Sequence, residues 1–93
     1  MMQIQQTGGR WNVRGDVIIG SVNALLEASQ QFVLNAGTIV DFKDVGNVDT
    51  SAIGLILEWK RRAKRENCTL ELANMPENLK SLVALYGVSD IVN

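Results

Sequence analysis

Apolar and polar positions at the start of the chain first alternate and then recur every three or four residues. Alternation over residues 4–8 and 10–17 predicts two short strands, joined by a turn at Gly8-Gly9. Over residues 21–32 the spacing becomes that of an amphipathic helix. The positions on its apolar face are Val22, Leu25, Leu26 and Ser29. The first third of the sequence therefore predicts a β-hairpin followed by a helix.

The middle of the chain predicts a buried strand, a polar turn and a second helix. Residues 38–42 are apolar almost throughout, which indicates a central strand covered on both faces. A polar turn over residues 43–47 is expected to follow. Helical spacing of apolar positions then favours a helix from Ser51 to about Glu66. The strand and the helix are thus joined by a turn that ends near Ser51.

The last third predicts one more strand and one more helix. Leu70 and Leu72 belong to a short strand that begins at Cys68. Residues 74–77 have the features of a helix start, with Asn74 as candidate cap, an early proline and a first-turn acid. Gly87 is expected to end that helix. The order is β-β-α-β-α-β-α, which predicts an α/β fold with a mixed sheet of about four strands and helices packed on it.

The composition indicates one ordered globular domain over residues 1–93, because no linker, repeat or low-complexity stretch interrupts it. A net charge of −1 argues against general affinity for nucleic acid. No apolar run approaches the roughly 18 residues of a membrane span. The sequence shows no positively charged segment followed by an apolar stretch, so secretion is not expected. With the single cysteine Cys68, the sequence predicts a protein of the reducing cytoplasm.

Missing residue types restrict the chemistry of the chain. It contains no histidine, which is the commonest general base and the commonest metal ligand. Cys68 has no second cysteine or histidine with which to form a zinc site, and is most simply a small buried apolar residue. We therefore expect no enzyme activity, no metal and no cofactor.

The main candidate site is Asp49-Thr50-Ser51, at the predicted start of the second helix. A carboxylate and two hydroxyls at this position can cap the helix, carry a phosphate near its partly positive end, or contact a partner. Asn47, at the end of the polar turn, is grouped with them as a candidate partner-binding residue. The residue types alone leave all three roles open.

The chain resembles the STAS domain family, which includes anti-sigma-factor antagonists and the cytoplasmic ends of sulfate transporters. The family signature is an apolar strand ending in Asp, a loop, and then Asp-Ser/Thr followed by small residues that open a helix. Asp41 matches the strand-end Asp, Asp49-Thr50 matches the Asp-Ser/Thr pair, and Ser51-Ala52 covers the small-residue step. The resemblance extends over nearly the whole chain and implies the same fold.

Within that family the chain is similar to MlaB-like sequences, the small cytoplasmic STAS subunits of phospholipid-transporting Mla ABC systems. The similarity rests on Val48-Asp49-Thr50 and on the ending over residues 85–91. It implies a non-enzymatic subunit that binds and supports the ATPase of the transporter, in a system that maintains outer-membrane lipid asymmetry. Such a subunit associates with the inner membrane only through the transporter complex.

The resemblance implies that Thr50 contacts the partner, because it lies at the position of the family's regulatory Ser/Thr. An alternative function is an anti-sigma-factor antagonist that is regulated by phosphorylation at Thr50 or Ser51. One departure disfavours that alternative: residues 15–18 keep a glycine and one acid of a family loop, but Ile18 replaces the second acid. A third alternative is a module that binds a small anion or a lipid at the start of the second helix.

Several other residues allow two interpretations each. Residues 60–65 contain five of the nine basic residues, either as a solvated helix end or as a patch for an anionic membrane or acidic partner. Trp59 lies on the apolar stripe of the second helix and is expected in the core. We expect Trp11, in a short early strand, to be half exposed. Leu85 and Tyr86 are candidates for extending the partner surface.

Overall fold

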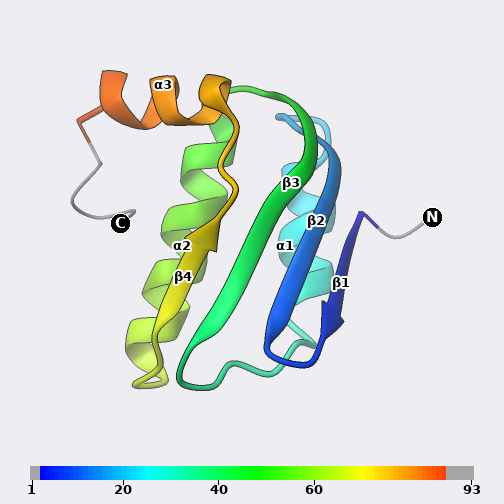
Figure 1. Ribbon diagram of the computed structural model, residues 1–93, viewed down its shortest axis with the longest axis vertical. Helices are drawn as coiled ribbons and strands as arrows, with labels where there is room; N and C mark the ends of the chain where they lie inside the picture. The colour runs from blue at the N-terminus through cyan, green and yellow to red at the C-terminus, as the bar shows by residue number, and fades with distance from the viewer. Residues whose placement is uncertain (1–2, 88–93) are drawn as a thin grey trace.

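The computed structural model describes residues 3–87, which form four strands and three helices (Figure 1). In chain order these elements are β1 Ile4–Thr7, β2 Arg10–Val17, α1 Val22–Ser29, β3 Thr38–Val48, α2 Ser51–Arg65, β4 Leu70–Ala73 and α3 Glu77–Leu85. This is the order that the hydrophobic pattern predicts. The predicted fold class, α/β with a mixed sheet, is therefore confirmed.

The strands form one sheet in the order β1-β2-β3-β4. β1 runs antiparallel to β2, whereas β2 and β3, and β3 and β4, are parallel. The turn between β1 and β2 uses Gly8, whose φ of 61° suits a residue without a side chain. Because a helix joins each pair of successive parallel strands, the carboxyl ends of β2, β3 and β4 lie at one edge of the sheet. α3 crosses near this edge (Figure 1).

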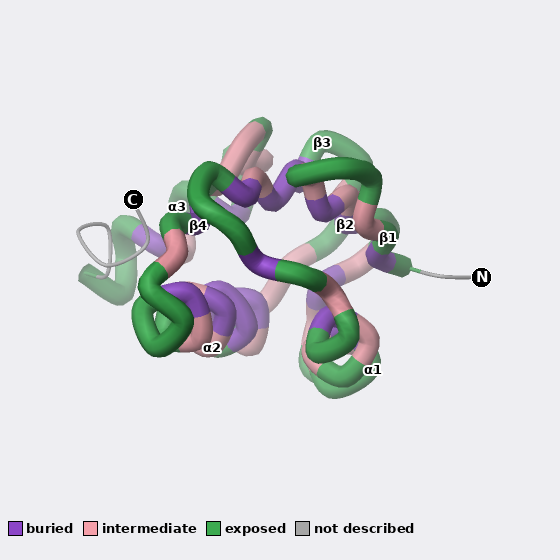
Figure 2. The backbone as a smooth tube through the Cα atoms, turned by 90° about the horizontal axis from the view of Figure 1, so that it is seen from below, coloured by how far each residue is buried: buried purple, intermediate pink, exposed green. Residues whose placement is uncertain are grey.

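Helices α1 and α2 cover the same face of the sheet. Figure 2 shows both of them on one side of the strands. The opposite face carries Arg10, Asn12 and Asp41, which are neighbours across β2 and β3. Helices therefore cover only one face of β3, but Asp41 on the other face is buried under Arg10 and Asn74, so the prediction of cover on both faces is confirmed in part. Val40 faces the core, whereas Ile39 on the open face remains partly exposed.

The predicted polar turn over residues 43–47 is instead the second half of β3. The strand continues to Val48, which is paired with Val17 at the end of β2. The register between the two strands shifts twice on the way, first between Asn12 and Arg14 of β2. The exposed polar side chains of this half resemble those of a turn, but backbone pairing with β2 keeps the chain extended. The longer β3 carries the chain directly to the start of α2.

The ends of several elements also differ from the prediction. α1 ends at Ser29, about one turn earlier than expected. Asn74 does not cap α3, because its side-chain amide donates to the Asp41 carboxylate instead. Cys68 is half-buried and lies before β4, so it is not the first residue of that strand. Gly87 follows α3 with a φ of 67°, which confirms it as the stop of that helix.

Three aromatic rings form the centre of the core. Trp11 contacts Phe32 and Trp59 edge to face, with ring centroids 5.3 and 5.7 Å away. Both tryptophans are fully buried, which confirms the prediction for Trp59 and contradicts the half-exposed position expected for Trp11. Trp59 Nε1 donates to Ser29 Oγ at 2.8 Å. Trp11 Nε1 has no hydrogen-bond partner within the part of the chain that the structure describes.

The two tryptophans should therefore respond differently to replacement by phenylalanine. We expect Trp59→Phe to lower the free energy of unfolding by about 2 kcal/mol, because it removes both apolar contacts and a buried hydrogen bond. Trp11→Phe should lower the free energy of unfolding by about 1 kcal/mol less than Trp59→Phe does, because the Trp11 N–H makes no hydrogen bond within the described residues that the replacement would break. Urea unfolding of the two variants measures the difference. Equal losses would show that the bond to Ser29 adds nothing to stability.

Candidate functional site

Residues 49–51, the β3–α2 turn, place a carboxylate and two hydroxyls at the start of α2. The Asp49 carboxylate accepts a hydrogen bond from the Ser51 N–H at 2.9 Å and another from the Ser51 hydroxyl. It thereby satisfies a backbone donor of the first helical turn. The other carboxylate oxygen accepts the Ile19 N–H at 2.9 Å. Asp49 therefore caps α2 and also attaches the loop between β2 and α1 to the turn.

These hydrogen bonds keep Asp49 ionised. The Ser51 hydroxyl, the Ile19 N–H and the Ser51 N–H hold the pKa of Asp49 below its ordinary value, although partial desolvation acts in the other direction. A negative charge at this position complements the dipole of α2. A phosphate on the neighbouring Thr50 would gain from the same helix end but would be repelled by Asp49.

Thr50 is exposed in the middle of the turn. Its backbone is already helical, with φ −63° and ψ −21°, but its side chain makes no capping hydrogen bond. Capping thus belongs to Asp49, and the Thr50 hydroxyl is available to solvent. Asn47 is exposed as well, and its N–H donates to the Asp16 carboxylate at 2.9 Å. The candidate residues from the sequence lie together at the carboxyl edge of the sheet: Asn47, Asp49, Thr50 and Ser51.

One exposed apolar residue beside the turn is absent from the sequence-based candidates. Ile19 is 75% exposed, and its backbone is fixed by the hydrogen bond to Asp49. A single exposed aliphatic side chain is ordinary, but this one is held next to an exposed hydroxyl and a fixed charge. The sequence signal is Ile18-Ile19-Gly20, in which two β-branched residues continue past the end of β2. We call these five residues the turn surface: Ile19, Asn47, Asp49, Thr50 and Ser51.

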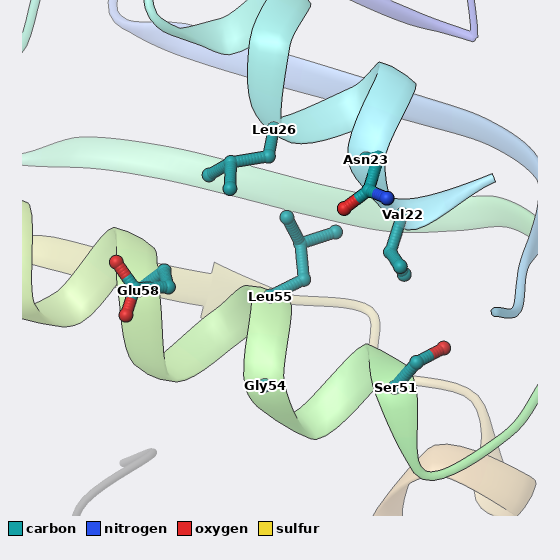
Figure 3. Close-up of a pocket in the computed structure, with 7 residues that line it drawn as sticks. All are labelled: Val22, Asn23, Leu26, Ser51, Gly54, Leu55 and Glu58. Carbon is teal, nitrogen blue, oxygen red and sulfur yellow. The ribbon is translucent and has the colours of Figure 1, made fainter.

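A groove opens between α1 and α2 beside the turn surface (Figure 3). Its volume is about 360 Å³, and its lining consists of Val22, Asn23, Leu26, Ser51, Gly54, Leu55 and Glu58. Figure 3 shows Leu26 and Leu55 facing one another across the space between the helices. Ser51 belongs to both the groove and the turn surface, so the two are continuous. Hydrophobic periodicity predicts each helix but not the gap that remains between them.

Asp41, the strand-end residue of the motif, has a structural position on the open face of the sheet. Its carboxylate accepts hydrogen bonds from Arg10 Nε and Nη2 at 3.1 and 3.0 Å, from the Lys43 N–H at 2.9 Å, and from the Asn74 amide at 3.0 Å. Burial raises the pKa of Asp41, but the bonds from Asn74, Lys43 and Arg10, with the Arg10 charge, outweigh burial and lower it. Asp41 thus connects β2, β3 and the loop before α3.

The basic run of residues 60–65 does not form one solvated surface. Arg62 is 17% exposed and donates to the backbone carbonyls of Ser29 and Phe32. Lys60 Nζ donates to the Leu70 carbonyl at 2.5 Å, and burial lowers the pKa of Lys60. The exposed cations of the run are Arg61, Lys64 and Arg65. For these three residues both interpretations, a solvated helix end and a patch for an anionic membrane or acidic partner, stay predictions, whereas Lys60 and Arg62 serve the fold.

The remaining candidates are less informative. Leu85 and Tyr86 are exposed at the end of α3, and residues 88–91 of the predicted ending lie outside the described residues. Within residues 3–87 no helix has the length and apolar character that crossing a bilayer requires. The same residues contain no cluster of three acidic or cysteine side chains arranged to hold a metal ion.

Solved structures share this fold at low sequence identity. A proposed anti-sigma factor antagonist from Thermotoga maritima gives a TM-score of 0.77 at 15% identity, over 97% of this chain and 81% of that one. A sulfate transporter family protein from Wolinella succinogenes gives 0.69 at 14% identity, over 96% and 75%. Mglu gives 0.63 at 21% identity over 82% of this chain, which spans only 20% of Mglu. At these identities the similarity shows the fold alone.

Sequence comparison identifies the family. No curated protein matches the chain. The family described as "Mlab, STAS domain" matches residues 1–93. The match includes the strand-end Asp41 and the Asp49-Thr50 pair that carry the resemblance. This chain therefore belongs to the STAS domain family, in the group described as Mlab.

Proposed function

We propose that this STAS domain is a non-enzymatic docking subunit that binds the ATPase of a phospholipid-transporting ABC system through the turn surface. The observation that carries the proposal is that the Asp49 side chain makes the structural hydrogen bonds of the turn and the Thr50 side chain does not. The Asp49 carboxylate accepts the Ser51 and Ile19 N–H groups, whereas the side chain of the exposed Thr50 makes no capping hydrogen bond. An exposed hydroxyl near an exposed aliphatic side chain, whose backbone is held in place, suits protein contact. The Mlab family match supports the choice of an ABC ATPase as partner.

The chemistry of the turn surface favours docking over catalysis. The chain has no histidine, so general-base chemistry would fall to a carboxylate. Asp49 is a poor candidate, because its oxygens already accept hydrogen bonds from Ile19 and Ser51 that stabilise the ionised form. In the proposed role the domain lies in the cytoplasm and reaches the inner membrane only through the ATPase. Its contribution to outer-membrane lipid asymmetry is support of that ATPase.

The second candidate function is an anti-sigma-factor antagonist whose binding is switched by phosphorylation. It is supported by the exposure of the Thr50 hydroxyl, which a kinase could reach. The Asp49 charge beside it and the missing second acid at Ile18 weigh against this function. Intact-mass measurement of protein purified from its native cell discriminates between the two: a stoichiometric phosphate on Thr50 or Ser51 would favour the antagonist.

Thr50→Glu tests the proposed function. We expect at least tenfold weaker binding to the ATPase, or about 1.4 kcal/mol, because a second carboxylate beside Asp49 must be desolvated in the interface. Thr7→Glu is the matched control, since Thr7 is exposed on β1 at the other end of the sheet. Titration calorimetry with the purified ATPase subunit measures both affinities. Unchanged binding of Thr50→Glu would exclude the turn surface as the contact.

A further inference from the structure

The groove between α1 and α2 has apolar walls and a small set of polar groups. Val22 and Leu26 come from α1, Leu55 comes from α2, and Figure 3 shows these side chains directed into the space between the helices. The polar lining consists of Asn23, Ser51 and Glu58. Apolar walls with a few polar groups are the usual composition of a site that receives another molecule's side chains.

Gly54 belongs to the lining of the groove. It is an exposed residue within α2, and a Cβ added to it would meet nothing within 4 Å. Glycine weakens the interior of a helix relative to alanine, so local helix stability does not account for a glycine here. A side chain at position 54 would add to the lining of the groove, which also includes Leu55 and Leu26.

The charges along the groove indicate what it receives. Glu58 lies at one end, and Asp49 lies beside Ser51 at the other. No lysine or arginine is among the lining residues. Glu58 pairs with Arg61, but the two side chains are 43% and 61% exposed, and a pair this open to solvent is weak enough to exchange for a partner's cation. The groove is therefore complementary to aliphatic side chains flanked by basic ones.

The dimensions favour a protein segment over a small molecule. From Ser51 to Glu58 the groove follows about two turns of α2, or roughly 10 Å. A small-molecule site buries most of its ligand, whereas the exposed Gly54 and Asn23 leave this groove open along its length. An amphipathic helix lying in a groove between two helices needs only one of its faces buried.

We infer that the groove binds a short amphipathic helix of the ATPase partner, with aliphatic side chains between α1 and α2 and lysine or arginine facing Glu58 and Asp49. This inference rests on the proposed function and extends it. In this arrangement the partner contacts Thr50 at the turn surface, and the groove adds apolar walls beside that contact. Ser51 joins the two parts of one interface.

Filling the groove tests the inference directly. Gly54→Leu places an aliphatic side chain in the open space, and we expect its affinity for the purified ATPase subunit to fall at least tenfold. Ala24→Leu is the matched control, because it adds a similar side chain to the exposed outer side of α1, and its affinity should change less than twofold. Thermal unfolding checks both folds. If Gly54→Leu is destabilised, Gly54→Ala replaces it, with an expected loss of about threefold.

The outcomes separate the inference from the proposed function. If the wild-type domain does not bind the ATPase, both are overturned. If the wild type binds and Gly54→Leu binds equally well, only the groove is excluded. Glu58→Lys should weaken binding at least threefold at low salt, and equal or tighter binding would exclude a basic partner segment.

A photo-crosslinking amino acid at Asn23, an exposed residue of the groove lining, identifies the occupant. A crosslink to an ATPase peptide that combines aliphatic and basic residues supports the inference. A crosslink to a phospholipid or to a second copy of this chain would overturn it.

Discussion

Replacing Arg62 by alanine should lower the free energy of unfolding by about 3 kcal/mol. The guanidinium donates to the Ser29 carbonyl at 2.8 Å and to the Phe32 carbonyl at 2.5 Å, so it supplies donors to the chain where α1 ends. Hydrogen bonds from a charged group contribute about 1.5–3 kcal/mol each, and the carbonyls would be left partly buried without them. Guanidinium chloride unfolding followed by circular dichroism measures the loss.

Arg62 makes two further contacts, one with a side chain of β2 and one at the end of α2. Its guanidinium lies 5.7 Å from the centre of the Trp11 ring, and its Nε donates to the Glu66 carboxylate at 2.8 Å. α1 has only 8 residues and is too short to be stable alone, so it depends on contacts of this kind. Loss of Arg62 should therefore loosen α1 and with it one wall of the groove.

Arg61→Ala is the matched control for Arg62→Ala. Arg61 is the preceding residue, is 61% exposed, and pairs only with the exposed carboxylate of Glu58. We expect its removal to cost less than about 0.5 kcal/mol. Arg62→Lys should give an intermediate loss, because a single ammonium group cannot reach both carbonyls in the planar geometry of a guanidinium. Equal losses for the Arg61 and Arg62 alanine variants would contradict the capping role.

The order of elements could be predicted because each one has a local signal. Alternation marks β1 and β2, and a period near 3.6 marks each helix; glycines with positive φ stand at the β1–β2 turn and after α3, at Gly8 and Gly87. The mixed sheet follows from that order, since a hairpin followed by βα units requires one antiparallel strand. Local signals are sufficient for this part of the fold.

The second half of β3 could not be predicted because its stability is not local. The strand is extended there by pairing with β2 across shifted registers, and its side chains are exposed and polar. The burial of Asp41 is also non-local, since it depends on Arg10 and Asn74, which are distant in sequence. A hydrophobic pattern indicates which side chains are buried against helices, but it does not indicate hydrogen-bond partners that are distant in sequence.

The candidate site was predictable only in part, because some of its residues are neighbours in sequence and others meet only in the fold. Asp49, Thr50 and Ser51 are adjacent in sequence at a helix start, so their proximity follows directly from the helix prediction. Ile19 joins them only because the end of β2 lies beside the end of β3. The inward position of Arg62 had a usable signal: it lies three residues after the buried Trp59, next to the apolar stripe of α2.

Replacing Asp41 by asparagine should lower the free energy of unfolding at pH 7 by about 2–3 kcal/mol. Asp41 is 4% exposed, and both of its oxygens accept hydrogen bonds from groups that can only donate: the Arg10 guanidinium, the Lys43 N–H and the Asn74 amide nitrogen. An asparagine has one acceptor oxygen, so its own NH₂ group must face a donor, and one bond is replaced by a repulsive contact. Urea unfolding at neutral pH gives the value.

The effect of Asp41→Asn should shrink in acid. The folded-state pKa of Asp41 lies below its ordinary value, so folding favours the ionised carboxyl. That stabilisation is fully present above the unfolded-state pKa of about 3.9 and is lost as the pH falls through the lower folded-state pKa. The variant lacks the carboxyl, so the wild-type advantage should decrease below about pH 4. Measuring both proteins across the acidic range isolates Asp41 from Asp49, whose pKa is also lowered.

Asp44→Asn provides the control for this experiment, because Asp44 is an exposed carboxylate on the same strand. Its replacement should change stability by less than about 0.5 kcal/mol at any pH in the range. A wild-type advantage over Asp41→Asn that stays constant into acid would mean that the shape of the side chain, and not its charge, holds β2, β3 and the loop before α3 together. In that case the motif's strand-end Asp would act as a packing residue, and the Arg10 charge would contribute nothing to the fold.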